Sequence, residues 1–374
     1  MKKTIGWKLV LAAAATTGAV HAQNANFLPG QLAVLRGGDG VVPQHLKQAP
    51  LFIDQYDPKG FNTAPTCTMA IPTNGAGAFF FNSHAATEGH LSRSADKHLL
   101  VFGGYGGVNL LEKPGTPALL DIQRGFCTVD AAGATHEYLY HLADPSEKMN
   151  PRGAATDGAG NFWGCGNSGA TLFLNPAGGK PPVEFADVES TRAIKLINHA
   201  VYTTLNGADG TAADKAPGIY QFVDNKAGAL LPLPQQADAN VGLVVPATAP
   251  YTKIAGFDLN ADKTIAYTAD TDAGIQKYVK TGGAWKLAYN FKIPQNIAAA
   301  DNHGNGCFGV AVDFSGPAPI IYATTTEGYN GSANSNRVVR IVDTDANATV
   351  TTVAQAPSAE IVFRGVDFTP EASH

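Results

Sequence analysis

Charged residues are scarce in this chain, and several common sequence motifs are missing from it. Only 15% of the 374 residues are charged and the net charge is −5, which excludes a broadly basic nucleic-acid-binding protein. There is no GxSxG elbow, no P-loop and no Rossmann fingerprint. A serine hydrolase, a nucleotide-dependent enzyme and a dinucleotide oxidoreductase therefore find no support in the sequence.

Long apolar runs are also missing, since no segment approaches the roughly 20 residues that cross a bilayer. Three lysines within the first eight residues precede an apolar run at 9–15, and residues 20–22 end in a small side chain. This order is typical of a secretory signal peptide. We therefore predict a signal peptide at 1–22 and an exported domain at 23–374, in the periplasm or outside the cell, monomeric and without a membrane span.

Glycine and proline, in contrast, are frequent, with 41 and 23 residues. They punctuate turns, so the composition favours many short strands over long helices. The segments "NPRGAATDGAGNFWGCG" from Asn150 and "TRAIKLINHAVYTTLNG" from Thr191 each contain a strand, a polar or Gly-rich turn and a second strand. A third and a fourth strand follow, as in "GIYQFVD" from Gly218 and "WKLAYNFKI" from Trp285. Four antiparallel strands recurring every ~40–65 residues are typical of β-propeller blades.

The two ends of the chain complete one another. "FRGVDFTPE" from Phe363 looks like the first strand of a repeat, while "QLAVLRGG" from Gln31 and the segments after it supply the other three. Closing the ring in this way removes the last open sheet edges. We therefore predict an all-β single propeller of six four-stranded blades, whose first strands begin near residues 88, 152, 192, 254, 307 and 364. The stretch 110–141 leaves room for a seventh blade.

In this repeat style the mature chain resembles exported bacterial β-propeller proteins of uncharacterised function. The WD dipeptide, the kelch double glycine, the Asp-box and the tryptophan-docking pattern of quinoprotein propellers are all missing. The resemblance therefore implies an architecture and no catalytic residues.

First strands line the central channel of a propeller, so residues at equivalent starts of these strands converge in space. Most of these positions hold basic residues, and two polar residues precede the first strand near 307. The set is His90, Arg152, Arg192, Lys253, Arg364, His303 and Asn305. A ring of basic residues would favour an anionic ligand, and arginine suits carboxylate or phosphate. Alternatively, each arginine pairs with a neighbouring blade and locks the two together.

The segment "SHAATEGHLSRS" from Ser83 is the densest cluster of candidate catalytic groups, with His84, Glu88, His90 and Arg93. Histidine exchanges protons near neutral pH, and a carboxylate can orient it. The same imidazoles and carboxylate could hold zinc, copper or iron, and ordinary rim residues are the third interpretation. Two Asp-rich turns, at 269–274 and 343–348, fall short of a complete calcium loop. No cofactor is predicted, and a divalent or transition metal stays an alternative.

These residues predict an exported lyase or hydrolase that acts at the channel mouth on an anionic or polyhydroxylated substrate, such as a uronate-containing glycan or a carboxylate ester. The predicted catalytic residues are His84, Glu88, His90 and His303. The predicted substrate-binding residues are Arg93, Arg152, Arg192, Lys253, Asn305 and Arg364. One alternative is a non-catalytic propeller that binds a ligand or a protein partner, and another is a metal-dependent enzyme that uses the histidines.

The four cysteines are widely spaced and form no CxxC pair, which argues against a zinc site. Exported proteins commonly form disulfides. Because Cys67 and Cys127 belong to adjoining blades, we predict a bond between them. Cys165 and Cys307 belong to opposite blades, so we expect none there.

Overall fold

A computed structural model provides the coordinates of the protein. It describes residues 26–40, 50–82, 86–106, 122–141, 150–167, 171–185, 188, 190–206, 215–294, 306–327, 335–358 and 360–373. Apart from one 3-10 turn, η2 (Pro176–Gly178), the regular elements in these ranges are β-strands. No helix among the described residues is long and apolar enough to cross a membrane.

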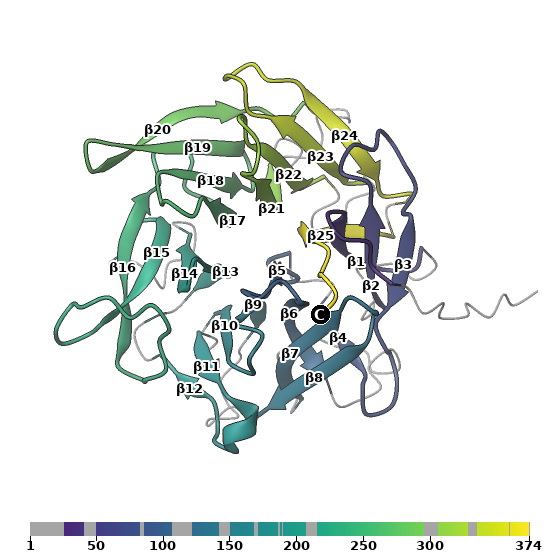
Figure 1. Ribbon diagram of the computed structural model, residues 1–374, viewed down its shortest axis with the longest axis vertical. Helices are drawn as coiled ribbons and strands as arrows, with labels where there is room; N and C mark the ends of the chain where they lie inside the picture. Colours follow the sequence, from purple (N-terminus) through teal and green to yellow (C-terminus); the bar gives the residue numbers. More distant parts are fainter. Residues whose placement is uncertain are drawn as a thin grey trace, which may run out of the picture.

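The strands form six sheets arranged in a ring (Figure 1). Blade 1 consists of β5 (Leu91–Arg93), β6 (Leu99–Gly106), β7 (Gln123–Asp130) and β8 (Thr135–Tyr140), with β4 (Phe79–Phe80) paired to the end of β6. Blade 2 consists of β9 (Pro151–Thr156), β10 (Phe162–Gly166), β11 (Leu172–Leu174) and β12 (Val183–Glu184). Blade 3 consists of β13 (Thr191–Ile197), β14 (Ala200–Leu205), β15 (Gly218–Asp224) and β16 (Ala239–Pro246).

The remaining three blades follow the same order. Blade 4 consists of β17 (Ile254–Leu259), β18 (Ile265–Asp270), β19 (Gly274–Thr281) and β20 (Ala284–Phe291). Blade 5 consists of β21 (Cys307–Asp313), β22 (Ile320–Thr325), β23 (Arg337–Val342) and β24 (Val350–Gln355). Blade 6 consists of β25 (Val362–Phe368), β1 (Leu32–Gly37), β2 (Leu51–Tyr56) and β3 (Cys67–Ala70).

The predicted all-β propeller of six blades is confirmed, including its closure by both ends of the chain. β25 pairs antiparallel with β1, with Leu32 opposite Phe368. The stretch 110–141, where the sequence leaves room for a seventh blade, contains β7 and β8, the third and fourth strands of blade 1. The closing strand pair joins the first and last parts of the chain and leaves no gap in the ring.

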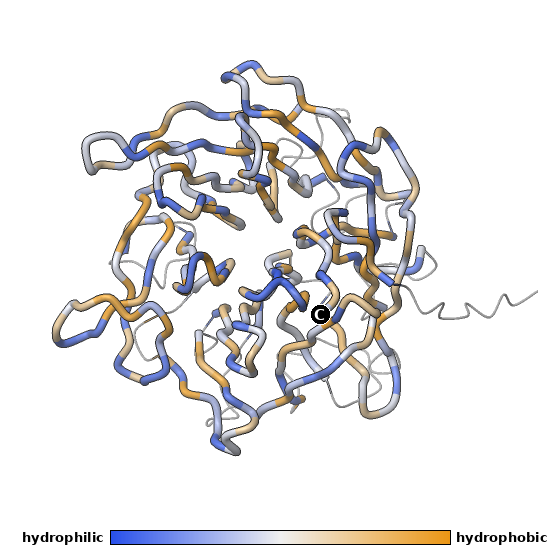
Figure 2. The backbone as a smooth tube through the Cα atoms, viewed as in Figure 1, coloured by the Kyte–Doolittle hydropathy of each residue, from blue (hydrophilic) through white to orange (hydrophobic). Residues whose placement is uncertain are grey.

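Hydrophobic clusters lie between the stacked blades, where the faces of neighbouring sheets meet. One cluster joins Trp163 of blade 2 with Ile194 and Phe222 of blade 3. The indole nitrogen of Trp163 donates to the Pro234 carbonyl at 2.7 Å. Figure 2 shows hydrophilic stretches at the outer hairpins and also near the centre of the ring. The centre therefore differs from the apolar layers between the blades.

A β-bulge interrupts the first strand of five blades at the same place. In β9, Gly153 pairs with Cys165 but Pro151 pairs with Gly166, so that Arg152 is the extra residue. Comparable irregularities occur at Arg192, Ala255, Phe308 and Arg364. A bulge changes the direction of a side chain relative to regular alternation. The sequence pattern alone did not predict this repeated feature.

Side chains of the second strands join these bulges to the next blade. The Cys165 thiol donates to the Arg192 carbonyl at 3.3 Å, and the Thr204 hydroxyl donates to the Ala255 carbonyl at 3.5 Å. The Thr324 hydroxyl donates to the Arg364 carbonyl at 2.5 Å. Each bond runs from the second strand of one blade to the bulge of the next, so the bulges are joints between blades.

The predicted Cys67–Cys127 disulfide is wrong, because all four cysteines are free thiols. Cys127 is fully buried in the apolar cluster that contains Phe102, and burial raises the pKa of its thiol well above the usual value. Cys67 lies at the start of β3, the outermost strand of blade 6, and is only half-buried. Membership of adjoining blades therefore did not bring the two side chains together.

Gly365 of β25 lies against the backbone of Gly89 and Leu91 at the start of β5, and it makes a testable contribution to stability. A Cβ atom there would lie 2.2 Å from the Leu91 nitrogen and 2.8 Å from the Gly89 carbonyl oxygen. Because both neighbours are backbone atoms, Gly365→Ala should lower the free energy of unfolding by about 1–3 kcal/mol. Urea unfolding measures this loss. The control is Gly316→Ala, whose nearest neighbour would be 3.6 Å away; equal stability of the two variants would contradict the expectation.

Candidate functional site

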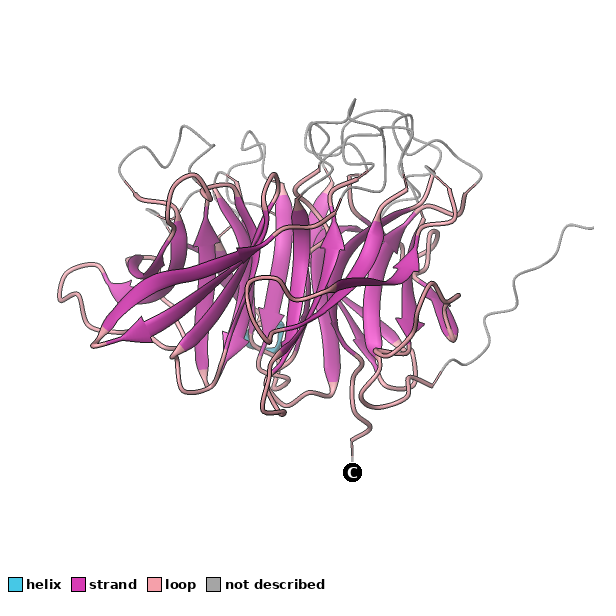
Figure 3. Ribbon diagram, turned by 90° about the horizontal axis from the view of Figure 1, so that it is seen from above, coloured by secondary structure: helices cyan, strands magenta, loops and turns pink. Residues whose placement is uncertain are grey.

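The first strands of the six blades line the axis of the ring. β25 ends at the face where the C-terminus leaves the ring, the lower face in Figure 3. We call this the exit face, and the opposite face, where the first strands begin, the entry face. The predicted basic residues belong to the starts of the first strands, so they are expected at the entry face.

The five bulge positions, together with His90 just before β5, place one side chain per blade near the axis. We call the following set the entry ring: His90, Arg152, Arg192, Ala255, Phe308 and Arg364. All six are buried, with exposed fractions of 2–7%. The His90 ring stacks on the Phe308 ring with centroids 4.1 Å apart, and the Arg364 guanidinium carbon lies 5.7 Å from the Phe308 centroid. Residues that are distant in sequence thus converge at the hub.

Two guanidinium groups of the entry ring are held by neighbouring blades. Arg152 Nη1 donates to the Thr191 carbonyl of blade 3 at 2.9 Å, and its Nε donates to the Thr87 hydroxyl at 3.2 Å. Arg364 Nη1 donates to the Ala86 carbonyl at 3.1 Å. The blade-locking interpretation therefore describes part of what these arginines do. The same bonds fix the guanidinium groups in position.

The Glu88 carboxyl lies next to these arginines and is completely buried. It accepts hydrogen bonds from the Asn82 backbone N–H at 2.8 Å and from the Tyr105 hydroxyl at 3.0 Å. Burial raises the pKa of Glu88 to about 8, although both hydrogen bonds and the charges of Arg152 and Arg364 act in the opposite direction. At neutral pH the Glu88 carboxyl is therefore mostly protonated.

His90 shows the opposite change. Burial, together with the positive charges of Arg192, Arg152, Lys195 and Arg364, lowers the pKa of its imidazole well below the usual value. The buried Nε2 atom of His90 has no hydrogen-bond partner within the described part of the chain. At neutral pH this region thus holds a neutral imidazole and a protonated carboxyl, which is the protonation state that an acid–base pair requires.

The structure does not bring Lys253 or Arg93 to the entry ring. Lys253 precedes β17, its side chain is 47% exposed, and it pairs with Asp272; the equivalent position in blade 4 is Ala255, two residues later. Arg93 ends β5 and lies toward the exit face, where it contacts Glu371. His84, His303 and Asn305 lie outside the described residues, so their roles stay predictions.

Neither Phe308 nor the bulges were predicted, although the sequence holds one indication of them, a small residue after five of the six ring positions. Ring residues are followed by a small residue in five blades: Arg152-Gly153, Arg192-Ala193, Ala255-Gly256, Phe308-Gly309 and Arg364-Gly365. A Cβ at Gly256 would lie 2.5 Å from the Phe308 carbonyl oxygen. The small residues therefore allow the first strands to approach each other closely around the axis.

Metal-ligating side chains do not cluster in the described ranges, which contain no group of three or more His, Cys, Asp or Glu that could hold an ion. The carboxylates of the two Asp-rich turns contact protein groups instead. Asp270 accepts the Lys253 and Asp272 backbone N–H groups, each at 2.9 Å, and Asp343 lies 2.6 Å from Lys277 Nζ. Metal binding through His84 falls outside the described residues.

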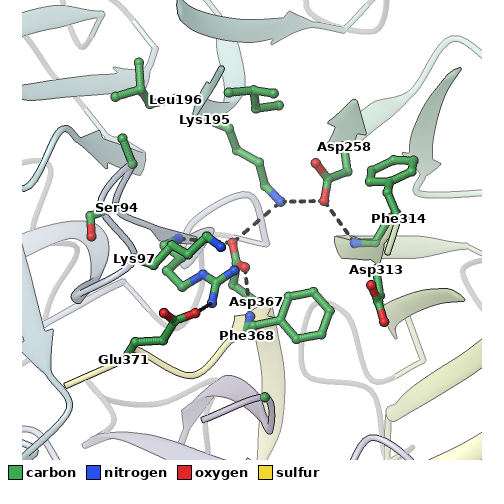
Figure 4. A pocket seen from close by; sticks show the side chains of 15 residues that line it. Ser94, Lys97, Lys195, Leu196, Asp258, Asp313, Phe314, Asp367, Phe368 and Glu371 are labelled. Atoms are coloured by element: carbon green, nitrogen blue, oxygen red, sulfur yellow. Dashed lines mark hydrogen bonds and ion pairs between the residues drawn. The ribbon is translucent and has the colours of Figure 1, made fainter. Parts of the chain in front are cut away.

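A small cavity lies behind the entry ring. Between the two faces, residues from five blades enclose a cavity of only ≈ 10 Å³, among them His90, Lys195 and Gly309. That is about the volume needed for one water molecule. At the exit face lies a much larger pocket of ≈ 490 Å³ (Figure 4). The two ends of the channel are therefore separate chemical environments.

Comparisons with known proteins extend to architecture only. No family model matches the chain, and no curated protein matches it. A structure of a nidogen/laminin complex aligns at a TM-score of 0.51 and 11% identity, over 90% of this chain and 98% of that chain. At this identity the similarity shows the fold alone.

Two further propellers align more weakly. One is Sqt1 from Chaetomium thermophilum bound to the N-terminus of ribosomal protein L10, with a TM-score of 0.39 and 14% identity over 87% of this chain and 73% of that chain. The other is an oligogalacturonate lyase from Vibrio parahaemolyticus, with a TM-score of 0.38 and 7% identity over 81% and 73%. Similarity at this level supports no argument about function.

Proposed function

We propose that the protein is an exported lyase or hydrolase that performs acid–base chemistry on a carboxylate-bearing substrate at the entry face. The observation on which the proposal depends is the convergence of Glu88 and His90 with Arg152, Arg192 and Arg364 at the starts of the first strands. Pairs of titratable groups whose environments shift their pKa values in opposite directions are typical of catalytic sites.

In this proposal the arginines bind the substrate carboxylate. Guanidinium groups suit carboxylates because they donate two parallel hydrogen bonds. Pairing with a cation also withdraws charge from the substrate and acidifies a neighbouring C–H bond. Arg152 and Arg364 are already fixed by bonds to the Thr191 and Ala86 carbonyls, so little side-chain entropy is lost on binding.

His90 and Glu88 then move the protons. In an elimination, the neutral His90 imidazole accepts the proton from the acidified carbon, the electrons of that C–H bond form a carbon–carbon double bond, and the neighbouring C–O bond breaks as protonated Glu88 donates its proton to the leaving oxygen. Bound carboxylate would also offset the arginine charges that lower the pKa of His90, so the imidazole becomes a stronger base when the substrate is present. His84 and His303 are further candidate bases, and Asn305 is a candidate substrate ligand.

A non-catalytic binding protein is the second candidate. It is favoured by the bonds from Arg152 and Arg364 to neighbouring blades, because structural arginines at the hub require no chemistry. The two candidate functions differ in whether the protein converts a bound ligand into a product.

The test is to incubate the purified protein with pools of uronate-containing oligosaccharides and of carboxylate esters, and to look for products by mass spectrometry. Wild-type protein should form product from at least one pool. Glu88→Gln should lower kcat on that substrate by roughly 100-fold or more, the range typical of a lost general acid. Arg192→Lys should raise KM, since it keeps the charge but loses the planar fork.

Lys253→Gln is the matched control, because Lys253 is a basic residue near a first strand that lies off the entry ring. Turnover by this variant should equal that of the wild type. Binding of a uronate without product would support the non-catalytic candidate. Equal activity of the Glu88→Gln variant and the wild type would overturn the proposed role of Glu88.

A further inference from the structure

We propose that the exit-face pocket is a second binding site, separate from the entry ring, for a neutral polyhydroxylated ligand of about one or two sugar rings. The pocket has a volume of ≈ 490 Å³, which lies within the usual range of small-molecule sites. Figure 4 shows charged and aromatic side chains from several blades around it. The proposal uses none of the residues assigned to acid–base chemistry.

The pocket is built by a second layer of first-strand residues. Arg93, Lys195, Asp258 and Asp367 each lie three residues after an entry-ring position. In blades 3, 4 and 6 a bulge adds one residue to the first strand, so there a spacing of three can bring two side chains to the same face where an even spacing normally would. The first strands therefore carry two sets of side chains, the entry ring at one end of the channel and the residues of the pocket at the other.

Most charges in this pocket are paired with one another, while Lys97 and Asp313, one cation and one anion, line it without an ion pair among the described residues. Lys195 Nζ lies 3.4 Å from Asp258 Oδ2 and 3.7 Å from Asp367 Oδ2, and it donates to the Val310 carbonyl at 3.0 Å. Arg93 Nη1 lies 3.5 Å from Glu371 Oε1. Since Lys195 and Arg93 already have carboxylate partners, a charged ligand that binds at these groups would have to disrupt a pair. A neutral ligand would not.

The charged side chains of the pocket can also form hydrogen bonds with the hydroxyls of a sugar. A carboxylate offers about four acceptor sites and an ammonium three donors, whereas a sugar hydroxyl both donates and accepts. Asp258 and Asp367 are held in place by backbone bonds, from Val312 N–H at 2.9 Å and from Arg93 N–H at 3.1 Å. Their carboxylates are thus preorganised for a ligand that carries several hydroxyls.

Two phenylalanine rings provide apolar surface in the pocket. Phe314 packs on Tyr267 with ring centroids 6.0 Å apart, and Phe368 packs edge-on to Tyr322 at 5.8 Å. Both also line the pocket. An aromatic face carries partial negative charge and attracts polarised C–H groups, such as those on one face of a sugar ring. Alternating polar and aromatic surface therefore favours a sugar over a simple ion.

The experiment is isothermal titration calorimetry of the full mature chain at pH 7 with glucose, mannose, galactose, cellobiose, maltose and lactose. Glucuronate and glucosamine serve as charged counterparts of glucose. At least one neutral sugar should bind measurably, and glucuronate and glucosamine should each bind roughly tenfold or more weaker than the best neutral sugar. Phe314→Leu and Phe368→Leu should each weaken the best ligand by about tenfold, since they keep apolar volume but remove the ring.

Phe61→Leu is the matched control, because Phe61 is 70% exposed and does not line the pocket; it should bind as the wild type does. Asp313→Asn, on the pocket rim, is a second variant in case a phenylalanine variant fails to fold, and it should weaken binding as well. The proposal is overturned if no neutral sugar binds, if a charged counterpart binds as tightly, or if the pocket variants bind like the wild type. Turnover at the entry face plays no part in this measurement, so either proposal can fail alone.

Discussion

Replacing Arg337 by methionine is expected to lower the free energy of unfolding by about 3–5 kcal/mol, the usual cost of breaking a buried ion pair from one side. The Glu327 side chain is completely buried, and that of Arg337 is 8% exposed. Arg337 Nε lies 3.2 Å from Glu327 Oε2, and Nη2 bonds the other carboxylate oxygen. Arg337→Met would leave the Glu327 charge buried and without this partner.

Urea unfolding at pH 7 measures the loss, and two other variants show its origin. The double variant Arg337→Met/Glu327→Met removes both charges, so it should recover much of the stability. Lys226→Met breaks an exposed pair, in which Lys226 is 85% exposed and lies 3.7 Å from Asp238, and should change stability by less than about 1 kcal/mol. If the double variant were no more stable than Arg337→Met, the cost would come from lost packing instead.

The same arginine also holds the chain just after blade 4. Arg337 Nη2 donates to the Pro294 carbonyl at 2.7 Å, and Pro294 directly precedes the segment that contains the candidate residues His303 and Asn305. Glu327 orients the guanidinium from the other side. The pair therefore fixes the chain at Pro294, just after blade 4 ends.

The blades were predictable from the sequence because each one repeats the same order of strand and turn, and that order survives divergence of individual residues. The start of β13 at Thr191 and the closure by β25 both follow from this repetition. Packing between blades requires little more than apolar residues at alternating positions. Each repeat thus indicates the same blade structure independently of the others.

The candidate sites were less predictable, because a single bulge decides which side chains face the axis. Aligning the starts of the first strands placed Lys253 in the ring, whereas the bulge in β17 gives that place to Ala255, two residues later. Because the bulges were not predicted, the spacing of three residues that brings Lys195 and Asp258 to the exit face was not recognised either. A bulge has no strong sequence signature beyond the small residue after it, such as Gly256. The predicted Cys67–Cys127 disulfide was wrong for a related reason. Whether two cysteines can bond depends on the direction of their side chains within the blades, which the order of the blades does not determine.

Glu88→Gln is expected to change the pH dependence of stability by about 5 kcal/mol between pH 4 and 8. The folded protein keeps the Glu88 proton up to about pH 8, whereas the unfolded chain loses it near pH 4.3. Folding therefore takes up a proton in this range, and the free energy of unfolding falls as the pH rises. The contribution is complete below pH 4.3 and is lost as the pH approaches 8. Glutamine does not titrate, so its curve should lack this fall.

Urea unfolding of both proteins at one-unit steps from pH 4 to 9 measures the difference, in which His90 and the other shared groups largely cancel. Glu371→Gln is the control, since its side chain is 45% exposed, and its curve should run parallel to that of the wild type. Parallel curves for Glu88→Gln would mean that Glu88 is ionised when folded. In that case it could not donate a proton at neutral pH. The stability measurement thus tests the protonation state that the proposed reaction requires, before any substrate is known.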